Sequence, residues 1–528
     1  MSRVGTDSVV LDGASLTPEA VVAVAREDAT VSIADEARRA VQESRARVES
    51  VLASGEAVYG VNTGFGELVD ERIPRTDLEA LQTNLLRSHA AGVGRELTRE
   101  EVRATMVARA NALVKGYSGI REAVVDVLVA MLNEGVHPVV PSRGSLGASG
   151  DLAPLAHMSL VLIGEGAADV AGDRLRGDEA LARAGLDPVT LEAKEGLALV
   201  NGTQLTVGLA ALAVHDAATA LRSADVAGAL TTEVTMSSTV PSHEAISAVR
   251  PHPGQAASAR NVRRLTAESG IVESHRNCDR VQDAYSLRCL PQVHGAVRDA
   301  LEHLREAVET ELNSATDNPL LFARTDAPDR ASGTGDAAVL SAGNFHGEPL
   351  ALRLDYAAGA LTELAAICER RVDRLLNPNV QESHLPPFLT DRSGVMSGYM
   401  IAQYTAAALL NECRSTGRPS VDSTPVSGNQ EDHVSMSGQS ALSFRSVVEN
   451  VQTVVGIELL CAAQAAEFLE ASPELSHGVG TDVAYETVRD VVPKLDADRA
   501  VHEDIDRVRT LVAEGLLVER VGEAVDLE

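Results

Sequence analysis

Apolar residues recur along much of the chain at the spacing of one face of an α-helix. Between positions 122 and 135 they stand at Val124, Val125, Leu128, Met131 and Leu132. This i, i+1, i+4, i+7, i+8 pattern predicts an amphipathic helix that stops at Gly135. The same spacing recurs over 361–375, before Asn377-Pro378, and over 451–459. The second half of the chain is therefore expected to consist of long, alanine-rich helices.

Few segments show the alternation of a β-strand. Aromatic residues make up 2% of the sequence, and alternating β-branched runs are rare, so the fold class predicted is mainly α. Glycine, proline and asparagine gather at 59–66, 141–150, 313–347 and 423–430. These clusters predict loops between helical blocks, where catalytic residues tend to lie. The acidic, glycine-containing stretch Thr325–Gly335 is expected to be a solvated hairpin or loop insertion.

The composition narrows the class of protein and its partners. The chain has 528 residues, 45% of them hydrophobic, but no run of about 20 apolar residues is free of charge, as a membrane-spanning helix would require. The first residues lack the pattern of a secretory signal, so we expect a cytoplasmic protein. The net charge of −30 opposes binding to nucleic acid or to an anionic membrane. Small molecules and further copies of the chain are the expected partners.

Lysine is rare in this acidic sequence. It occurs only at Lys115, Lys194 and Lys494, so arginine supplies nearly all of the 46 positive charges, against 76 acidic residues. Counterions in a salt-rich cytosol would screen the repulsion between the acidic groups. We therefore hypothesise a halophilic source. The alternative is an ordinary acidic protein from a mesophile.

The cysteines are scattered along the chain, at Cys278, Cys289, Cys368, Cys413 and Cys461. The absence of any C-x-x-C pair argues against a zinc site and against a disulfide framework. Most of the thiols are expected to be small core residues, and no metal is expected.

The segment from Gly144 to Leu155 has several possible interpretations. It could be a turn that leads into a helix, with Asp151 as the N-cap. A serine-hydrolase elbow is excluded, because G-x-S-x-G requires a glycine where Asp151 stands and a strand before it. The loop 60–66 lacks the third glycine of a dinucleotide fingerprint, and no G-K-[ST] occurs. Nucleotide binding is therefore not expected.

Ala148-Ser149-Gly150 also allows a reaction of the backbone. The Gly150 nitrogen can attack the Ala148 carbonyl and close a five-membered ring, which is easier without a Cβ on Gly150. Loss of water from the ring and from the Ser149 side chain would give 4-methylidene-imidazol-5-one, a strong electrophile. The tripeptide alone is too common to establish this chemistry.

Seven longer segments, one of which contains this tripeptide, support the ring-forming reaction, because they resemble motifs of the histidine and phenylalanine ammonia-lyase family. They are Tyr59–Gly66, Asn84–Gly92, Gly144–Leu155, Lys194–Gln204, Val281–Arg288, Gly343–His346 and Asn429–His433. The resemblance implies a carbon–nitrogen lyase that eliminates ammonia from an amino acid, with the cofactor formed from Ala148, Ser149 and Gly150. It also implies an N-terminal lobe over 1–205 that carries the cofactor and a helical bundle over 206–528. The chain would form a homotetramer, with loops from more than one subunit in each active site.

The resemblance implies roles for single residues. Ser149 would supply the methylidene carbon, Tyr59 would be the general base beside the substrate's β-carbon, and Arg288 would clamp the carboxylate through two hydrogen bonds. Neutral polar residues that line cofactor and substrate in the family match Asn201, Gln282 and Tyr285. Each of these side chains could instead be structural, as a packed tyrosine, a solvated arginine or a satisfied buried polar group.

Two residues bear on the substrate. The position of His89 is apolar in relatives that act on phenylalanine, whereas Ser88-His89 resembles the histidine-specific form, since a buried polar partner favours a ring that returns its hydrogen bond. Glu431 can pair with the imidazole or the amino group, and Phe345 and Met400 are expected to pack nearby.

The reaction implied is deamination of L-histidine to trans-urocanate and ammonia, the first step of histidine degradation. The alternatives are a tyrosine or phenylalanine ammonia-lyase or an aminomutase with the same cofactor, or a catalytically silent helical oligomer.

Overall fold

The structure is a computed structural model that describes residues 8–63, 73–276, 281–469 and 474–528. The helices of the first part of the chain are α1 (Pro18–Arg26), α2 (Asp35–Ser54), α3 (Leu78–His89), α4 (Arg99–Val114), α5 (Glu122–Asn133), α6 (Leu152–Leu162), α7 (Gly177–Arg183), α8 (Glu195–Val200), α9 (Gln204–Val234) and α10 (Glu244–Val249). The later helices are α11 (Pro253–Leu265), α12 (Gly270–Ser274), α13 (Tyr285–Arg288), α14 (Leu290–Leu312), α15 (Glu348–Leu376), α16 (Met400–Ser415), α17 (Ser437–Ala466), α18 (Val479–Val491), α19 (Val501–Ala513) and α20 (Leu516–Gly522). The prediction of a mainly α fold is confirmed.

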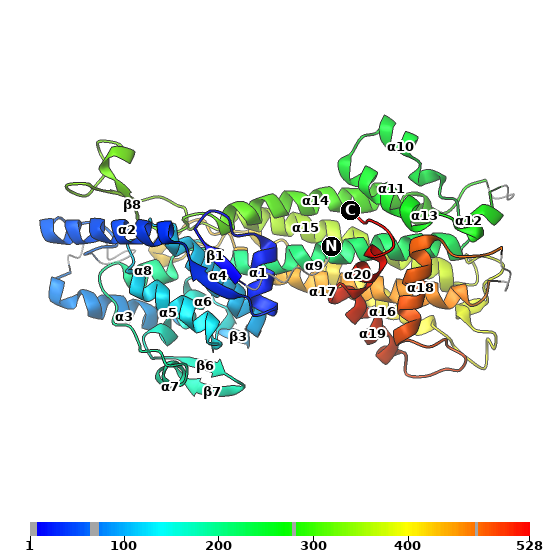
Figure 1. Ribbon diagram of the computed structural model, residues 1–528, viewed down its shortest axis with the longest axis horizontal. Coiled ribbons are helices and arrows are strands. Elements are labelled where there is room, and N and C mark those ends of the chain that lie inside the picture. Colours follow the sequence, from blue (N-terminus) through cyan, green and yellow to red (C-terminus); the bar gives the residue numbers. More distant parts are fainter. Residues whose placement is uncertain (1–7, 64–72, 277–280, 470–473) are drawn as a thin grey trace.

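Four long helices form the centre of the elongated molecule. Helices α9, α14, α15 and α17 run side by side along its long axis (Figure 1). Helices α2, α3, α5, α6, α7 and α8 gather at one end of this bundle, whereas α10, α11, α12, α13, α16 and α18 lie at the other end. The two ends are therefore separated by the length of the bundle.

The three helices predicted from apolar spacing are present. The first is α5, and Gly135 just beyond it has φ +69°, which suits glycine at a helix end. The second is α15, which ends at Leu376, directly before Asn377-Pro378. The third is α17, which extends from 437 to 466. The apolar residues of each helix are buried in the protein interior, as their periodicity predicts.

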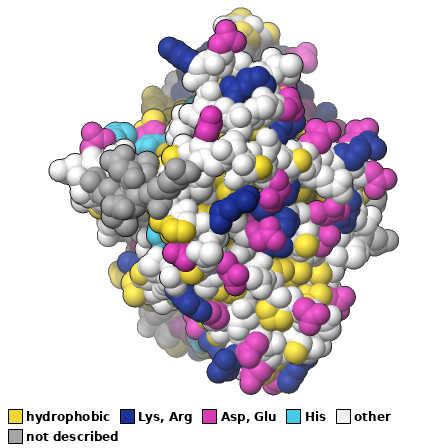
Figure 2. Space-filling view, turned by 90° about the vertical axis from the view of Figure 1, so that its left-hand side faces the viewer, with side chains coloured by type: hydrophobic (Ala, Val, Ile, Leu, Met, Phe, Trp, Pro, Cys, Tyr) yellow, Lys and Arg dark blue, Asp and Glu magenta, His cyan; other side chains and the backbone are white. Residues whose placement is uncertain are grey.

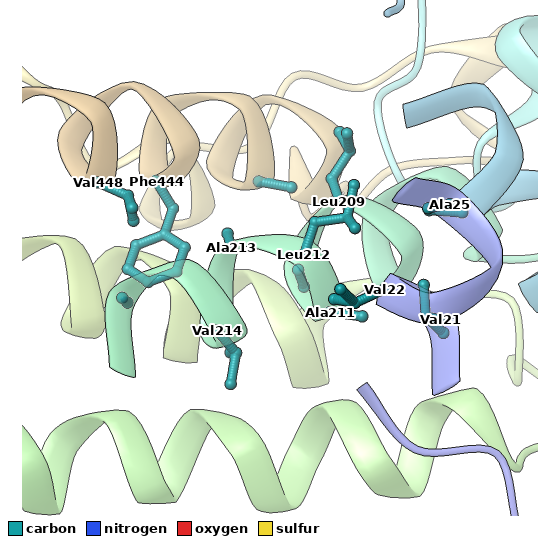
Figure 3. Packing of buried hydrophobic residues seen from close by; sticks show 14 of the residues in the cluster. Val21, Val22, Ala25, Leu209, Ala211, Leu212, Ala213, Val214, Phe444 and Val448 are labelled. Atoms are coloured by element: carbon teal, nitrogen blue, oxygen red, sulfur yellow. The ribbon is translucent and has the colours of Figure 1, made fainter. Parts of the chain in front are cut away.

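Small side chains let the central helices pack closely. Figure 3 shows residues of α9 between α1 and α17, with Phe444 of α17 directed towards Ala213. Helix α9 also approaches α4 so closely that a Cβ on Gly208 would lie 2.9 Å from the backbone of Ala104. Helices α4 and α9 are consequently buried on nearly every side.

In the described part of the chain the strands form four small sheets. Their bounds are β1 (Ser8–Leu11), β2 (Thr30–Ile33), β3 (Val93–Glu96), β4 (Val136–Pro138), β5 (Pro141–Arg143), β6 (Ala167–Val170), β7 (Asp173–Arg176), β8 (Leu320–Ala323) and β9 (Ala337–Leu340). The pair β1–β2 is parallel, and β3–β5, β4–β6–β7 and β8–β9 are antiparallel. The predicted loops at 141–150 and 313–347 thus contain short strands, and the 325–335 stretch is the expected hairpin tip between β8 and β9.

Among the described residues, two helices, α9 and α17, are long and apolar enough to cross a membrane by length and composition alone. The most apolar window of each, however, is 83% and 78% buried inside the protein, respectively. Burial against other helices is what the central helices of a large core require. The structure therefore explains the apolar character of both helices as core packing.

The prediction that most cysteines are small core residues agrees with the structure for the described residues. Cys368, Cys413 and Cys461 are buried thiols, and Cys289 is half-buried. Cys278 lies outside the described residues.

Charged side chains of both signs are interspersed at the end of the molecule that carries α2 and α3 (Figure 2). Arg38 of α2 forms ion pairs with Glu122 and Asp126 of α5, and Arg87 of α3 pairs with Glu165. Exposed pairs of this kind contribute only ~0–1 kcal/mol each and are screened by salt. They do not remove the repulsion expected from a net charge of −30.

A fully buried charge network lies inside the bundle. Arg371 of α15 donates to Glu458 of α17 at 2.5 and 2.9 Å, and it also contacts the ring of His294 on α14 at 3.2 Å. His294 in turn bonds Asp225 of α9 at 2.7 Å. The network therefore links the four central helices.

We expect Glu458→Gln to destabilise the fold, because it leaves the Arg371 guanidinium buried without its charge partner. Breaking a buried pair from one side costs about 3–5 kcal/mol. Denaturant titration followed by circular dichroism should show this loss. The control Asp173→Asn removes the exposed partner of Arg183, and its change should stay within about 1 kcal/mol. Equal stability of the Glu458 variant and the wild type would contradict the prediction.

Candidate active site

A cavity of about 1140 Å³ opens at the end of the molecule that carries α3, α6 and α8. Its walls come from these helices, from the start of α15 and from the 427–433 loop. The residues of the sequence prediction that line it are Tyr59, His89, Ala148, Ser149, Asn201, Phe345 and Glu431. Segments more than 350 positions apart in the chain thus meet in one cavity.

The backbone around Ser149 is held by the connection between α8 and α9. Gly150 has φ +78°, and a Cβ there would lie 2.3 Å from the carbonyl oxygen of Gly202. Directly after it, the Asp151 nitrogen donates to that same Gly202 oxygen at 2.7 Å. The side-chain amide of Asn201 donates to the Ser149 carbonyl at 2.8 Å. Only glycine fits at position 150, because of both its φ angle and the contact with Gly202.

The first turns of four helices surround this segment. Helix α6 begins at Leu152 and α9 follows Gly202 closely. Helices α15 and α17 approach through hydrogen bonds to the loop, since the Gly347 nitrogen donates to the Gly147 carbonyl at 2.9 Å and the Met436 nitrogen to the Leu146 carbonyl at 2.7 Å. Each helix N-terminus carries a partial positive charge of about half a unit. The cavity wall beside Ser149 therefore favours anionic groups.

Asp151 has a different role from the helix cap considered in the sequence analysis. It precedes α6, but its carboxylate caps no amide of that helix. It accepts hydrogen bonds instead from the backbone nitrogen of Thr206 and from the Ser145 hydroxyl, both at 2.8 Å. Burial raises the pKa of the Asp151 carboxyl, against the effect of these hydrogen bonds. Asp151 thus fastens the loop to the first turn of α9.

The orientation of the His89 ring defines what it offers to the cavity. Its Nδ1 lies 2.9 Å from the carbonyl oxygen of Leu85, which can only accept a hydrogen bond. Burial lowers the pKa of His89, so the ring is neutral near pH 7, with its hydrogen on Nδ1. The other nitrogen, Nε2, is then a hydrogen-bond acceptor.

Glu431 and Phe345 lie in the same cavity on other segments. Burial raises the pKa of the Glu431 carboxyl, which is half-buried. The neighbouring rings of His346 and His433 are stacked, with centroids 5.7 Å apart, and the His346 ring lies 3.2 Å from the His433 carbonyl. This pair joins the segment that carries Phe345 to the one that carries Glu431.

Four predicted site residues do not reach this cavity within one chain. Gln282, Tyr285 and Arg288 lie in or next to α13, and Met400 is the first residue of α16. Both helices stand at the opposite end of the bundle from α6 and α8 (Figure 1). The Tyr285 side chain is 72% exposed. A single chain therefore does not bring these residues together with Ser149.

The cavity also contains polar residues that the sequence analysis did not single out. Asn318 accepts a hydrogen bond from the Ala342 nitrogen at 2.7 Å. Glu348, at the start of α15, has a buried carboxylate oxygen without a hydrogen-bond partner in the described part of the chain. Both lie in glycine- and asparagine-rich loops or at their ends, so loop composition was the available signal.

Comparison with known proteins gives these features a family context. The sequence matches the family model for aromatic amino acid lyases over residues 16–490. It is 66% identical to a probable histidine ammonia-lyase from Halobacterium salinarum, over 99% of both chains. It is 51% identical to a histidine ammonia-lyase from Gloeobacter violaceus, over 98% of both chains.

Solved structures give the same picture. A tyrosine aminomutase from Streptomyces globisporus superposes with a TM-score of 0.91 at 38% identity, over 99% of both chains. A histidine ammonia-lyase from Trypanosoma cruzi superposes with a TM-score of 0.88 at 41% identity, over 98% of this chain and 96% of that one. Because sequence and fold agree over nearly the whole length, the chain belongs to the aromatic amino acid lyase family.

Proposed function

We propose that the protein is a histidine ammonia-lyase, which converts L-histidine to trans-urocanate and ammonia. The observation that carries this proposal is the placement of His89 and Ser149 in one cavity. His89 offers its Nε2 as an acceptor for an imidazole N–H, and Ser149 lies in the tripeptide from which the electrophile would form. The protein is thus a carbon–nitrogen lyase of histidine degradation.

The surroundings of Ser149 fit a 4-methylidene-imidazol-5-one formed from Ala148, Ser149 and Gly150. Gly150 has a left-handed φ and lies so close to Gly202 that it has no room for a Cβ, which suits a position whose nitrogen must close a ring. Ala148 and Ser149 face the cavity, where a methylidene carbon would meet a substrate. Asn201 holds the Ser149 carbonyl oxygen through its amide. When formed, this group supplies an electrophilic carbon that accepts the substrate's amine and so activates its departure.

Tyr59 is the general base in this proposal. It lines the same cavity as Ser149, and its role requires the phenolate form. A phenol has an ordinary pKa of about 10, so this role requires a cationic or hydrogen-bonding environment around the Tyr59 hydroxyl. The partial positive charges of the helix N-termini beside Ser149 favour binding of the substrate's carboxylate.

His89 and Glu431 select the substrate ring. The neutral His89 accepts a hydrogen bond at Nε2, and an imidazole N–H can donate it, whereas a phenyl ring would leave it unpaired. Glu431 faces the same space and pairs with the imidazole or the amino group. Phe345 provides an apolar contact for the ring.

The complete site in this proposal is shared between subunits of a homotetramer. Arg288 clamps the substrate carboxylate, and Gln282, Tyr285 and Met400 complete the site, all contributed by a partner chain. The exposed position of Tyr285 supports this, because a tyrosine with a catalytic role needs a covering surface. Residues 1–205 form the cofactor-carrying lobe and 206–528 the helical bundle of a cytoplasmic enzyme. Its acidic, lysine-poor composition supports a halophilic source.

A tyrosine aminomutase is the second candidate function. It is favoured by the superposition on the S. globisporus enzyme, and by the acceptor Nε2 of His89, which a phenol hydroxyl could also use. Incubation with L-histidine and, separately, with L-tyrosine distinguishes the two. Urocanate absorbance reports the first reaction, and chromatography of β-tyrosine reports the second. Formation of β-tyrosine without urocanate would overturn the proposed function.

Ser149→Ala should give a folded protein without lyase activity, because it removes the carbon that becomes the electrophile. Intact-mass measurement should show that the wild type lacks two water molecules and that the variant does not. Ser159→Ala is a matched control, since that buried hydroxyl of α6 has no hydrogen-bond partner in the described residues. It should keep both the activity and the mass deficit. Substantial turnover by the Ser149 variant would refute the cofactor.

Arg288→Lys should lower kcat/KM for histidine about 10- to 100-fold, since one charge-assisted hydrogen bond is worth ~1.5–3 kcal/mol and an ammonium cannot form the planar clamp. Steady-state kinetics of urocanate formation measure the change. The exposed Arg250 supplies the control Arg250→Lys, which should behave as the wild type. Near-normal kinetics of the Arg288 variant would show that this residue is not the anchor.

Low salt should dissociate the tetramer. With −30 charges on each chain, dilution from 0.15 to 0.01 M salt lengthens the range of repulsion from about 8 to about 30 Å. Because the proposed site needs several chains, activity should fall together with assembly, and both should recover in molar salt. Sedimentation and urocanate formation across a salt series test this. A fully active tetramer in dilute buffer would refute the halophilic character and leave the ammonia-lyase function intact.

A further inference from the structure

Arg109 of α4 lies in the interior of the protein. Its side chain is 1% exposed, and its guanidinium donates to the side-chain oxygen of Gln204 and to the backbone carbonyl of Ala198. Its Nε has no hydrogen-bond partner among the described residues. Burial lowers the pKa of Arg109 to about 10, so the group stays charged near neutrality. A buried charge without a bonded carboxylate is unfavourable for folding, and stability alone does not explain it.

The two hydrogen bonds of Arg109 reach residues on either side of the short connection between α8 and α9. Ala198 lies in α8 and Gln204 is the first residue of α9, so the guanidinium joins both sides of the link at 201–203. Gln204 is itself fixed, because its amide donates to the Thr316 hydroxyl at 2.7 Å. Helices α4 and α9 pack tightly at Gly208, which keeps Arg109 in place. The link therefore has little freedom to move.

Arg109 also contacts Gly202, the residue that lies against Gly150. A Cβ on Gly202 would lie 2.5 Å from a guanidinium nitrogen of Arg109, and a Cβ on Gly150 would lie 2.3 Å from the Gly202 oxygen. Asn201, in the same link, donates to the Ser149 carbonyl. A continuous series of contacts thus runs from Arg109 through the 201–202 link to the backbone of Ser149 and Gly150.

Ring closure requires these contacts to hold the backbone at 148–150 in a defined geometry. The Gly150 nitrogen must form a bond with the Ala148 carbonyl carbon, whose oxygen leaves as water with the amide protons of Gly150 and Ser149. A second water leaves from the Ser149 hydroxyl and the proton on its Cα. Both steps conserve electrons and need no further reactant. An amide donor on the Ser149 carbonyl stabilises the negative charge that develops as the Cα proton leaves.

We propose that Arg109, together with Gln204, is a positioning residue for this cyclisation. Arg109 holds the 201–202 link against Ser149 and Gly150, so that the Gly150 nitrogen lies within reach of the Ala148 carbonyl and the Asn201 amide stays on the Ser149 oxygen. Arg109 touches none of the reacting atoms, and it acts through Gly202 and Asn201. The inference rests on the cofactor of the proposed function.

The test follows loss of water in freshly synthesised full-length chains. Folded protein is isolated at successive times, and the mass of the fragment with residues 148–150 is measured. Arg109→Met replaces the charge with an apolar side chain of similar length. We expect the folded variant to lose water about 100-fold more slowly than the wild type, because a misplacement of about 1 Å slows a reaction by that order.

Arg103→Met is the matched control on the same helix. Arg103 is 2% exposed, and it also donates to backbone carbonyls, those of Val24 and Leu132, both at 2.8 Å. These partners lie away from the 201–202 link. The control should therefore lose both waters at the wild-type rate even if its stability falls, whereas a general effect of losing a buried arginine would slow both variants equally and would overturn the proposal.

A second variant keeps the test decisive if Arg109→Met does not fold. Gln204→Met retains the arginine and removes its side-chain acceptor, and it should also slow the loss of water. A wild-type rate in the folded Arg109 or Gln204 variant would overturn the positioning role and leave the cofactor intact. A wild-type protein that retains both waters would overturn the cofactor itself, and the inference with it.

Discussion

The contact between the backbones of Gly150 and Gly202 constrains much of the remaining structure. Neither position has room for a side chain, so the link between α8 and α9 must lie directly on the segment that opens α6. This fixes where α9 begins, and α9 is the helix around which α1, α4, α14 and α17 pack. Helices α15 and α17 are tied to the same loop by backbone hydrogen bonds at Gly147 and Leu146. Four helix N-termini consequently point their partial positive charges at one place.

The sequence predicted helices whose apolar residues recur at helical spacing. The apolar stripes of α5 and α15 were recognisable, because each has a polar side to contrast with it. The apolar residues of α17 at 451–459 also indicated a helix, although nearly all side chains of that stretch are buried. Helix α4 has no such stripe, since both faces are buried and two arginines, Arg103 and Arg109, lie inside the protein. Apolar spacing alone does not identify a helix that, like α4, is covered all round and also carries charged residues inside the protein. Such a helix is defined by its neighbours, which one sequence does not reveal.

The motifs contain many of the residues that line the cavity, but they do not show how far apart the predicted site residues lie within one chain. Ser149, His89 and Asn201 line one cavity, whereas Tyr285 and Arg288, in α13, lie at the other end of the bundle. A motif records which residues act together, and it does not record whether they belong to the same copy of the chain. The hydrogen bonds of Asp151 were missed for a related reason. Its partner Thr206 is 55 positions away, and only the packing of α6 against α9 brings the two together.

Buried charged residues contact the backbone near both groups of candidate site residues, the group around Ser149 and the group in α13. At one end, Arg109 supports the link that holds Ser149, and Lys194 forms a buried pair with Asp317 at 2.8 Å. At the other end, the Arg371 network reaches α13, because Arg371 donates to the Ser286 carbonyl at 3.3 Å. Interior ion networks are weak sources of stability but strong constraints on geometry. If the active site joins opposite ends of different chains, each half is therefore rigid before assembly, and association needs only to dock two preformed surfaces.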